Sequence, residues 1–198
     1  MGVDQGDMLS VAIGILSRDT IKFIYYEETQ VWGRLEYLMS QFGIHRCVID
    51  AMPNKHSAKT FASKFPGRVS IQYFGSRSLK IDKEMLENRI PIDTVHVDRT
   101  DSLDGMQDRM EGGYLQMPSR SKCEGLALTK IEDARRHLKA LVSRIEENNY
   151  GYLKRVYVSG RGVENHLAMA MNSACIAAYE LGQHSAPTMV VPIFGGRY

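Results

Sequence analysis

The chain has 198 residues, of which 43% are hydrophobic and 24% charged, and its formal net charge is +2. This length supports one substantial core. The small positive charge neither demands nor excludes nucleic-acid binding, because a binding face needs locally clustered Lys and Arg rather than a high total. Three cysteines without CxxC spacing argue against a disulfide framework or zinc ribbon and favour a reducing compartment. No signal peptide and no apolar run of membrane length occurs, which predicts a soluble protein.

The first half of the chain switches between strand-like and helix-like apolar spacing. In chain order it predicts a hairpin of two strands (8–16 and 21–26), a helix (32–42), a strand (47–49), a helix (55–65) and a strand (69–74). Thr29 is the expected cap of the first helix and Asn54 that of the second, while Gly43 lies just past the first helix.

The second half is less regular. Residues 75–92 mix basic and acidic side chains without a clean period, so we expect a surface excursion there. The remaining predictions are a short strand (94–97), a helix from 98 to Gly112-Gly113, a loop-like stretch (114–128), a long amphipathic helix (131–145), a strand (155–158) and a helix (167–181). The charged side of the long helix is either a solvated face or a DNA contact.

Two acids adjoin apolar runs that predict strands, since the segment of Asp4 leads into Val11–Leu16 and Asp50 closes its own run. Asp4 lies in Gly2-Val3-Asp4-Gln5-Gly6-Asp7, and Asp50 closes Arg46-Cys47-Val48-Ile49-Asp50. A carboxylate among β-branched residues is costly to bury, so it lies at the mouth of a sheet where a cation, a basic partner or water balances it. The pair therefore indicates the beginning of a metal site, and the alternative is two aspartates that start turns.

A third polar group stands at the start of the last predicted helix. Glu164-Asn165-His166 follows the turn Ser159-Gly160-Arg161-Gly162 and precedes apolar residues at helical spacing. Asn165 is either an ordinary N-cap or a functional amide, and His166 is either a satisfied first-turn histidine or a ligand.

Several segments together resemble the nuclease domain of the large terminase subunit of tailed bacteriophages, which belongs to the RNase H-like, RuvC-like superfamily. They are Gly2–Gly6, Val48–Ala51 with Pro53, Val97–Thr100 followed by Leu103-Asp104, Leu115–Pro118, and Gly162–Ala170 followed by Ile176-Ala177. Their order and spacing extend over nearly the entire chain. No GxxxxGK[ST] motif occurs, so the ATPase motor of such proteins is missing, and residues 1–198 look like a single nuclease domain.

The resemblance implies an α/β RNase H-like mixed β-sheet flanked by helices. It also implies a metal-dependent endonuclease that cuts concatemeric double-stranded viral DNA during genome packaging, using two Mg²⁺ or Mn²⁺ ions. The implied partners are DNA, the terminase ATPase domain, the small terminase subunit and the portal protein, in the host cytoplasm and without a membrane. A junction resolvase or transposase core is a more distant alternative.

Residue by residue, the resemblance carries over only in part. Asp4 and Asp50 match the first two metal-binding positions, whereas Asn165 and His166 stand where the family usually shows aspartate. Three explanations are open. His166 or Glu164 supplies the missing ligand, Asn165 was substituted for aspartate by design, or the domain has lost catalysis and serves as a silent DNA-binding and motor-docking module.

Other charged residues near these positions have weaker assignments. Asp7 is a turn residue or an outer ligand, and Lys55, His56 and Lys59 either contact phosphate or form a solvated helix face. For Arg99 we expect pairing with Asp98 or Asp101, or a place over the sheet, rather than DNA contact.

Overall fold

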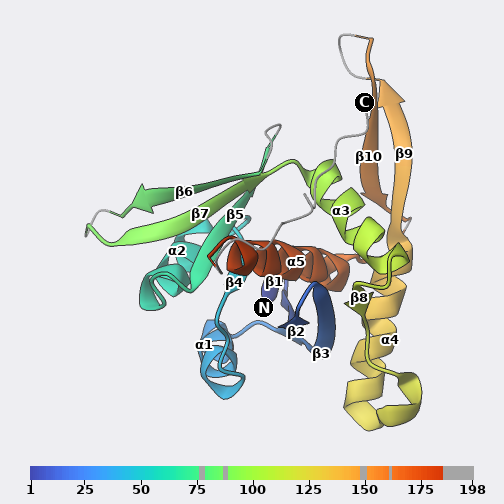
Figure 1. Ribbon diagram of the computed structural model, residues 1–198, viewed down its shortest axis with the longest axis horizontal. Coiled ribbons are helices and arrows are strands. Elements are labelled where there is room, and N and C mark those ends of the chain that lie inside the picture. The colour runs from blue at the N-terminus through green and yellow to red at the C-terminus, as the bar shows by residue number, and fades with distance from the viewer. Residues whose placement is uncertain (76–78, 87–88, 148–150, 161, 185–198) are drawn as a thin grey trace.

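The computed structural model describes residues 1–75, 79–86, 89–147, 151–160 and 162–184 (Figure 1). The elements in chain order are β1 (Gly2–Gln5), β2 (Leu9–Ser17), β3 (Thr20–Thr29), α1 (Trp32–Gln41), β4 (Cys47–Asp50), α2 (Lys55–Lys64), β5 (Val69–Phe74), β6 (Lys80–Met85), β7 (Pro91–Val97), α3 (Arg99–Glu111), β8 (Leu115–Gln116), the 3-10 turn η1 (Arg120–Lys122), α4 (Gly125–Ala140), β9 (Leu141–Glu147), β10 (Leu153–Ser159) and α5 (His166–His184).

Eight strands form one mixed sheet in the order β6-β7-β5-β4-β1-β2-β3-β8. Strands β1, β2 and β3 pair antiparallel, whereas β4, β5 and β7 continue the sheet parallel to β1. Helix α5 packs along β1, β2 and β4 on one face, and α1 and α2 cover the other (Figure 1). The predicted α/β architecture, a mixed sheet flanked by helices, is confirmed.

The centre of the sheet is built for close approach of α5. All four residues of β1 are buried, and the face of α5 is rich in buried alanine. A Cβ atom at Gly2 would lie 2.0 Å from the carbonyl oxygen of Ala170 and 2.2 Å from the backbone nitrogen of Ala174. Only glycine fits there, so the strand that carries Asp4 contacts the backbone of α5 directly.

The helix boundaries test the predicted caps. Asn54 caps α2 as expected, because its side chain accepts a hydrogen bond from the Ser57 N–H at 3.1 Å. The cap predicted at Thr29 is wrong. The N-cap of α1 is Val31, which makes no side-chain cap, and the Thr29 hydroxyl instead accepts from the Val31 N–H in the preceding turn.

Three segments of the second half differ from their predictions. The expected excursion over 75–92 contains β6 and the start of β7. Arg77, which belongs to this segment, lies outside the described residues. The loop-like stretch 114–128 contains β8, η1 and the first turn of α4. Residues 141–145 are not helical, because α4 ends at Ala140 and β9 pairs with β10.

The errors at β6 and β9 share one physical cause. Strand β6 is exposed at nearly every position, and Val142 and Ile145 in β9 are 48% and 69% exposed. Without a buried face, a strand has no reason to alternate polar and apolar residues. The β9–β10 hairpin extends away from the main sheet, and β10 packs against α3 (Figure 1). No helix among the described residues combines the length and apolar content needed to cross a bilayer.

Candidate active site

Asp4 and Asp50 lie side by side on neighbouring parallel strands. The register pairs Val3 with Ile49, so the next residues along β1 and β4 are the two acids. Side chains alternate along a strand, so Asp4 faces α5 as Gly2 does, and Asp50 faces it as Val48 does. The structure therefore brings together two carboxylates that are 46 positions apart in the sequence.

His166 joins this pair from the first residue of α5. Its Nδ1 lies 2.7 Å from Oδ2 of Asp4. A Cβ atom at Gly6 would lie 2.8 Å from Cε1 of the ring, so the glycine after β1 leaves room for the imidazole. The hydrogen bond to Asp4 raises the pKa of His166. A protonated His166 would thus neutralise part of the acidic charge.

The two carboxyl groups resist ionisation in this environment. Burial raises the pKa of Asp4, and the hydrogen bond and charge of His166 oppose this shift. The pKa of Asp50 is raised to about 6, chiefly by burial and further by repulsion from Asp4. Both aspartates therefore destabilise the fold when they are charged and no cation balances them, and perturbed acids of this kind are common at functional sites.

The backbone after Asp50 is fixed by two side chains. Oδ1 of Asp50 accepts a hydrogen bond from the Met52 N–H at 3.1 Å. The Gln5 amide donates to the carbonyl oxygen of Asp50, and its Oε1 accepts from the Asn54 N–H at 3.2 Å. Gln5 thereby joins the end of β1 to the turn that carries the second acid. The sequence analysis did not identify this role.

Asn165 and Glu164 lie immediately before α5. Asn165 is 6% exposed, and its Nδ2 is a buried atom that finds no hydrogen-bond acceptor in the described part of the chain. Glu164 is exposed, and its charge is near enough to raise the pKa of His166 further. The triplet therefore places one imidazole, one unsatisfied amide and one solvated carboxylate near the paired acids.

A guanidinium also lies within electrostatic range of both acids. Arg99 begins α3, its Cζ lies 5.7 Å from the centroid of the Phe74 ring, and its Nη2 lies 3.9 Å from Sδ of Met169. Its charge opposes the rise in the pKa of Asp4 and of Asp50. Of the alternatives expected for Arg99, the contact with Phe74 of β5 agrees with a place over the sheet. Among the described residues it forms no ion pair with Asp98 or Asp101, and Asp98 caps α3 and lies 3.3 Å from Lys154.

The other charged residues predicted near the site lie apart from the two acids. Lys59 pairs with Glu84, and Lys55 lies 5.0 Å from the centroid of the Tyr73 ring. His56 and Asp7 are exposed. None of these positions is tied by a contact to Asp4 or Asp50 in the described residues.

The donor set fits a hard divalent cation at Asp4 and Asp50. Two carboxylates whose charges repel are ligands that Mg²⁺ and Mn²⁺ prefer, and the imidazole of His166 suits Mn²⁺ better than Mg²⁺. Within the described ranges, however, no cluster of three or more His, Cys, Asp or Glu side chains is arranged to hold a metal.

Divalent metal should stabilise the protein more at about pH 7.5 than at about pH 5. The folded-state pKa of Asp50, about 6, lies above its ordinary value, so the stability linked to this group is lost as the pH rises through 6. The raised pKa values of Asp4 and His166 act in the same direction. A cation that binds the ionised carboxylates restores this stability.

Thermal unfolding with and without millimolar Mn²⁺ at both pH values measures the effect, and Asp50→Asn should remove most of the difference. An equal Mn²⁺ shift at both pH values would place the ion elsewhere.

The similarity of this chain to known proteins lies in its structure and not in its sequence. No family model matches the chain, and no curated protein matches it in sequence. The chain is similar in structure to the large terminase nuclease of thermophilic phage G20c with bound magnesium, at 12% identity over 88% of this chain and 84% of that one, with a TM-score of 0.49. It is also similar to the human cytomegalovirus terminase nuclease domain, soaked with manganese and bound to an inhibitor, at 12% identity over 90% and 81%, with a TM-score of 0.45.

Proposed function

We propose that this chain is a divalent-metal-dependent endonuclease that cuts double-stranded DNA during viral genome packaging. The observation that supports it most is the pairing of Asp4 with Asp50 at the ends of β1 and β4, where burial and mutual repulsion raise the pKa of Asp50 to about 6. A cation bound by the two carboxylates would relieve their repulsion. Without a cation, the charged pair lowers the stability of the fold.

Each residue of the site has a separate task in this proposal. A bound ion would activate water and stabilise charge on the phosphate. Asp4 and Asp50 hold the ion, and Gln5 keeps Asp50 in register through its contacts with Asp50 and Asn54. His166 holds one oxygen of Asp4, which orients the other. The guanidinium of Arg99, packed on Phe74, is placed to attract a phosphate next to the acids.

The biological setting is proposed from the sequence resemblance. The substrate is concatemeric viral DNA, and the partners are the terminase ATPase domain, the small terminase subunit and the portal protein, all in the host cytoplasm. A net charge of +2 supports only weak binding of DNA by these residues alone, so the motor would supply the grip on the duplex.

A second candidate is a catalytically silent module that binds DNA and docks to the motor. It is favoured by the neutral Asn165 at a position where the resemblance leads us to expect a third carboxylate. With two carboxylates, a site can bind a cation without binding it well enough for hydrolysis.

Nicking of a supercoiled plasmid with Mg²⁺, Mn²⁺ or a chelator separates the two candidates. The nuclease proposal expects nicking with metal, faster with Mn²⁺, and none with the chelator. If Asn165 is a metal ligand weakened by its lack of charge, Asn165→Asp should increase Mg²⁺-supported nicking by about tenfold or more. His166→Ala should reduce the Mn²⁺-supported rate of nicking. If neither the parent nor Asn165→Asp nicks the plasmid with either metal, only the silent module remains as a candidate.

A further inference from the structure

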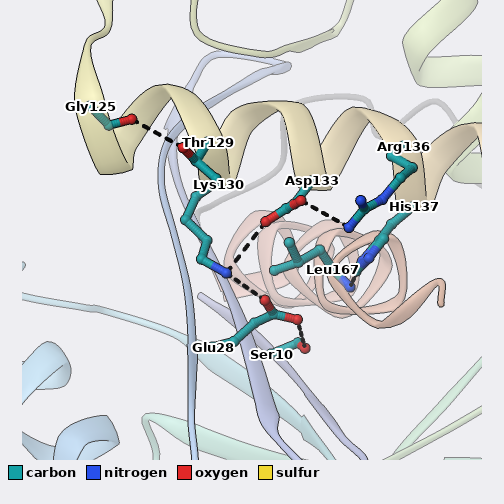
Figure 2. A network of polar contacts seen from close by, with 9 residues as sticks. All are labelled: Ser10, Glu28, Gly125, Thr129, Lys130, Asp133, Arg136, His137 and Leu167. Carbon is teal, nitrogen blue, oxygen red and sulfur yellow. Dashed lines mark hydrogen bonds and ion pairs between the residues drawn. The ribbon is translucent and has the colours of Figure 1, made fainter.

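A buried histidine of α4 contacts the first turn of α5, and the site described above gives it no task. His137 is 1% exposed and lies on the buried stripe of α4 together with Ile131, Ala134 and Ala140. Its Nδ1 accepts a hydrogen bond from the Leu167 N–H at 3.2 Å (Figure 2). The donor belongs to the residue directly after His166.

This contact changes how the start of α5 is capped. The first backbone N–H groups of a helix have no partner within the helix, and the side chain of the preceding residue usually accepts from the second or third of them. Asn165 occupies that preceding position, and asparagine is a preferred cap. Here the N–H of Leu167, the second residue of α5, is donated to His137 instead. The capping group therefore comes from another helix.

The side chain of Asn165 therefore does not cap α5. A cap accepts through Oδ1, and the hydrogen bonds of the described residues include none from the first turn of α5 to that atom. The side chain is more than nine-tenths buried, and its other polar atom, Nδ2, finds no acceptor in the described part of the chain. A buried donor without an acceptor costs free energy that a native structure rarely accepts without a use. A ligand oxygen at the Asp4–Asp50 site, such as a phosphate oxygen of DNA, would satisfy it.

A second contact fixes α4 where His137 needs it to be. Two turns before His137, Nζ of Lys130 lies 2.6 Å from Oε2 of Glu28 and 3.4 Å from Oδ2 of Asp133 (Figure 2). Glu28 is on β3, paired in register with Ser10, which itself pairs with Asp4. One face of α4 thus contacts both the row of the sheet that contains Asp4 and the helix that carries His166.

We propose that His137 is a positioning residue that caps α5 in place of Asn165, holds His166 against Asp4, and leaves the Asn165 amide for the phosphate of the substrate. The role needs a neutral Nδ1 that accepts, and burial lowers the pKa of His137, in keeping with a neutral ring. This inference rests on the proposed nuclease function for its last part alone, because the capping is independent of catalysis.

A matched pair of variants tests the capping. Asparagine places Oδ1 near the position of Nδ1, whereas leucine has a similar shape and no acceptor, so the pair is His137→Asn and His137→Leu. We expect amide hydrogen exchange of Leu167 to accelerate by about tenfold or more in His137→Leu and to stay near the parent value in His137→Asn. Equal exchange in the parent and His137→Leu would overturn the capping.

Metal binding tests the positioning. Loss of a partner that orients a metal ligand typically lowers affinity by about 10- to 100-fold, so Mn²⁺ should bind that much more weakly to His137→Leu, with rescue by His137→Asn. Leu138→Ala is the control, since it removes a neighbouring, partly buried side chain of α4 that does not accept the hydrogen bond of the Leu167 N–H. If Leu138→Ala weakens Mn²⁺ binding as much as His137→Leu does, His137 has only a packing role.

Asn165→Ala tests the release of the amide. We expect a melting temperature within about 1 °C of the parent, together with at least about tenfold slower nicking, whereas loss of a true cap should lower the melting temperature by about 2–4 °C. That larger drop would overturn the proposal. If the parent binds no Mn²⁺ and cuts no DNA, the proposed function fails, and the exchange rate of Leu167 still decides whether His137 caps α5.

Discussion

Asp4→Asn and Asp50→Asn should each lower metal-dependent nicking by more than about 100-fold, since the loss of one preorganised electrostatic group at a reacting centre has a cost of that size. The amide keeps the shape and most hydrogen bonds of the carboxyl group, and it removes the charge that holds the cation. Single-turnover nicking rates in saturating Mn²⁺ measure the effect.

Stability should change in the opposite direction for Asp50. Because burial and Asp4 raise its pKa, the charged carboxyl destabilises the metal-free fold at neutral pH, and Asp50→Asn should raise the melting temperature in the presence of a chelator. The control is Asp19→Asn, at the exposed turn between β2 and β3, which should alter neither property. Normal nicking by Asp50→Asn, or a lower melting temperature, would contradict a metal role for this residue.

Glu180→Leu should lower the free energy of unfolding by about 3–5 kcal/mol, because it leaves a buried guanidinium without its main partner. Oε2 of Glu180, which is fully buried, lies 2.8 Å from Nε of Arg46, and its Oε1 accepts from the Ser70 hydroxyl at 2.9 Å. Asp93, 3.1 Å from Nη1 of Arg46, balances only part of the charge. Urea unfolding followed by circular dichroism measures the loss.

The control for this pair is the ion pair between Lys64 and Glu36, whose side chains are 50% and 37% exposed. Glu36→Leu should cost less than about 1 kcal/mol, because water screens an exposed pair. A double variant Arg46→Met, Glu180→Leu should recover much of the loss, since it removes both charges together. If Glu180→Leu is as mild as Glu36→Leu, the buried pair does not stabilise the position of α5.

The sequence predicts those parts of the fold in which burial leaves a pattern. Strands β2, β3 and β5 contain buried residues, and the sequence predicts their bounds closely. The cap of α2 is predicted correctly because an asparagine before a helix acts locally, on the first turn. Strands β6 and β9 have little buried surface, so nothing in their spacing distinguishes them from a loop or from the end of a helix.

The candidate site shows the same division. Asp4 and Asp50 are identified from the sequence because each adjoins an apolar run that predicts a strand, which is a local signal. The hydrogen bond of Gln5 to Asp50 joins residues 45 positions apart, and that of His166 to Asp4 joins residues 162 apart, so no spacing rule reveals either pairing. His137 occupies an apolar stripe as a single polar residue, and only the position of α5 shows what it contacts.

The direct contact between Gly2 and α5 limits how the site can respond to its ligands. Backbone atoms of Ala170 and Ala174 fill the space that a side chain at position 2 would need, so the helix can neither slide nor roll without colliding with β1. Cation binding would then require only rotation of the side chains of Asp4, Asp50 and His166. Little conformational entropy remains to be lost on binding, and crystals of the protein with and without Mn²⁺ should superimpose at every backbone atom of β1 and the first turns of α5.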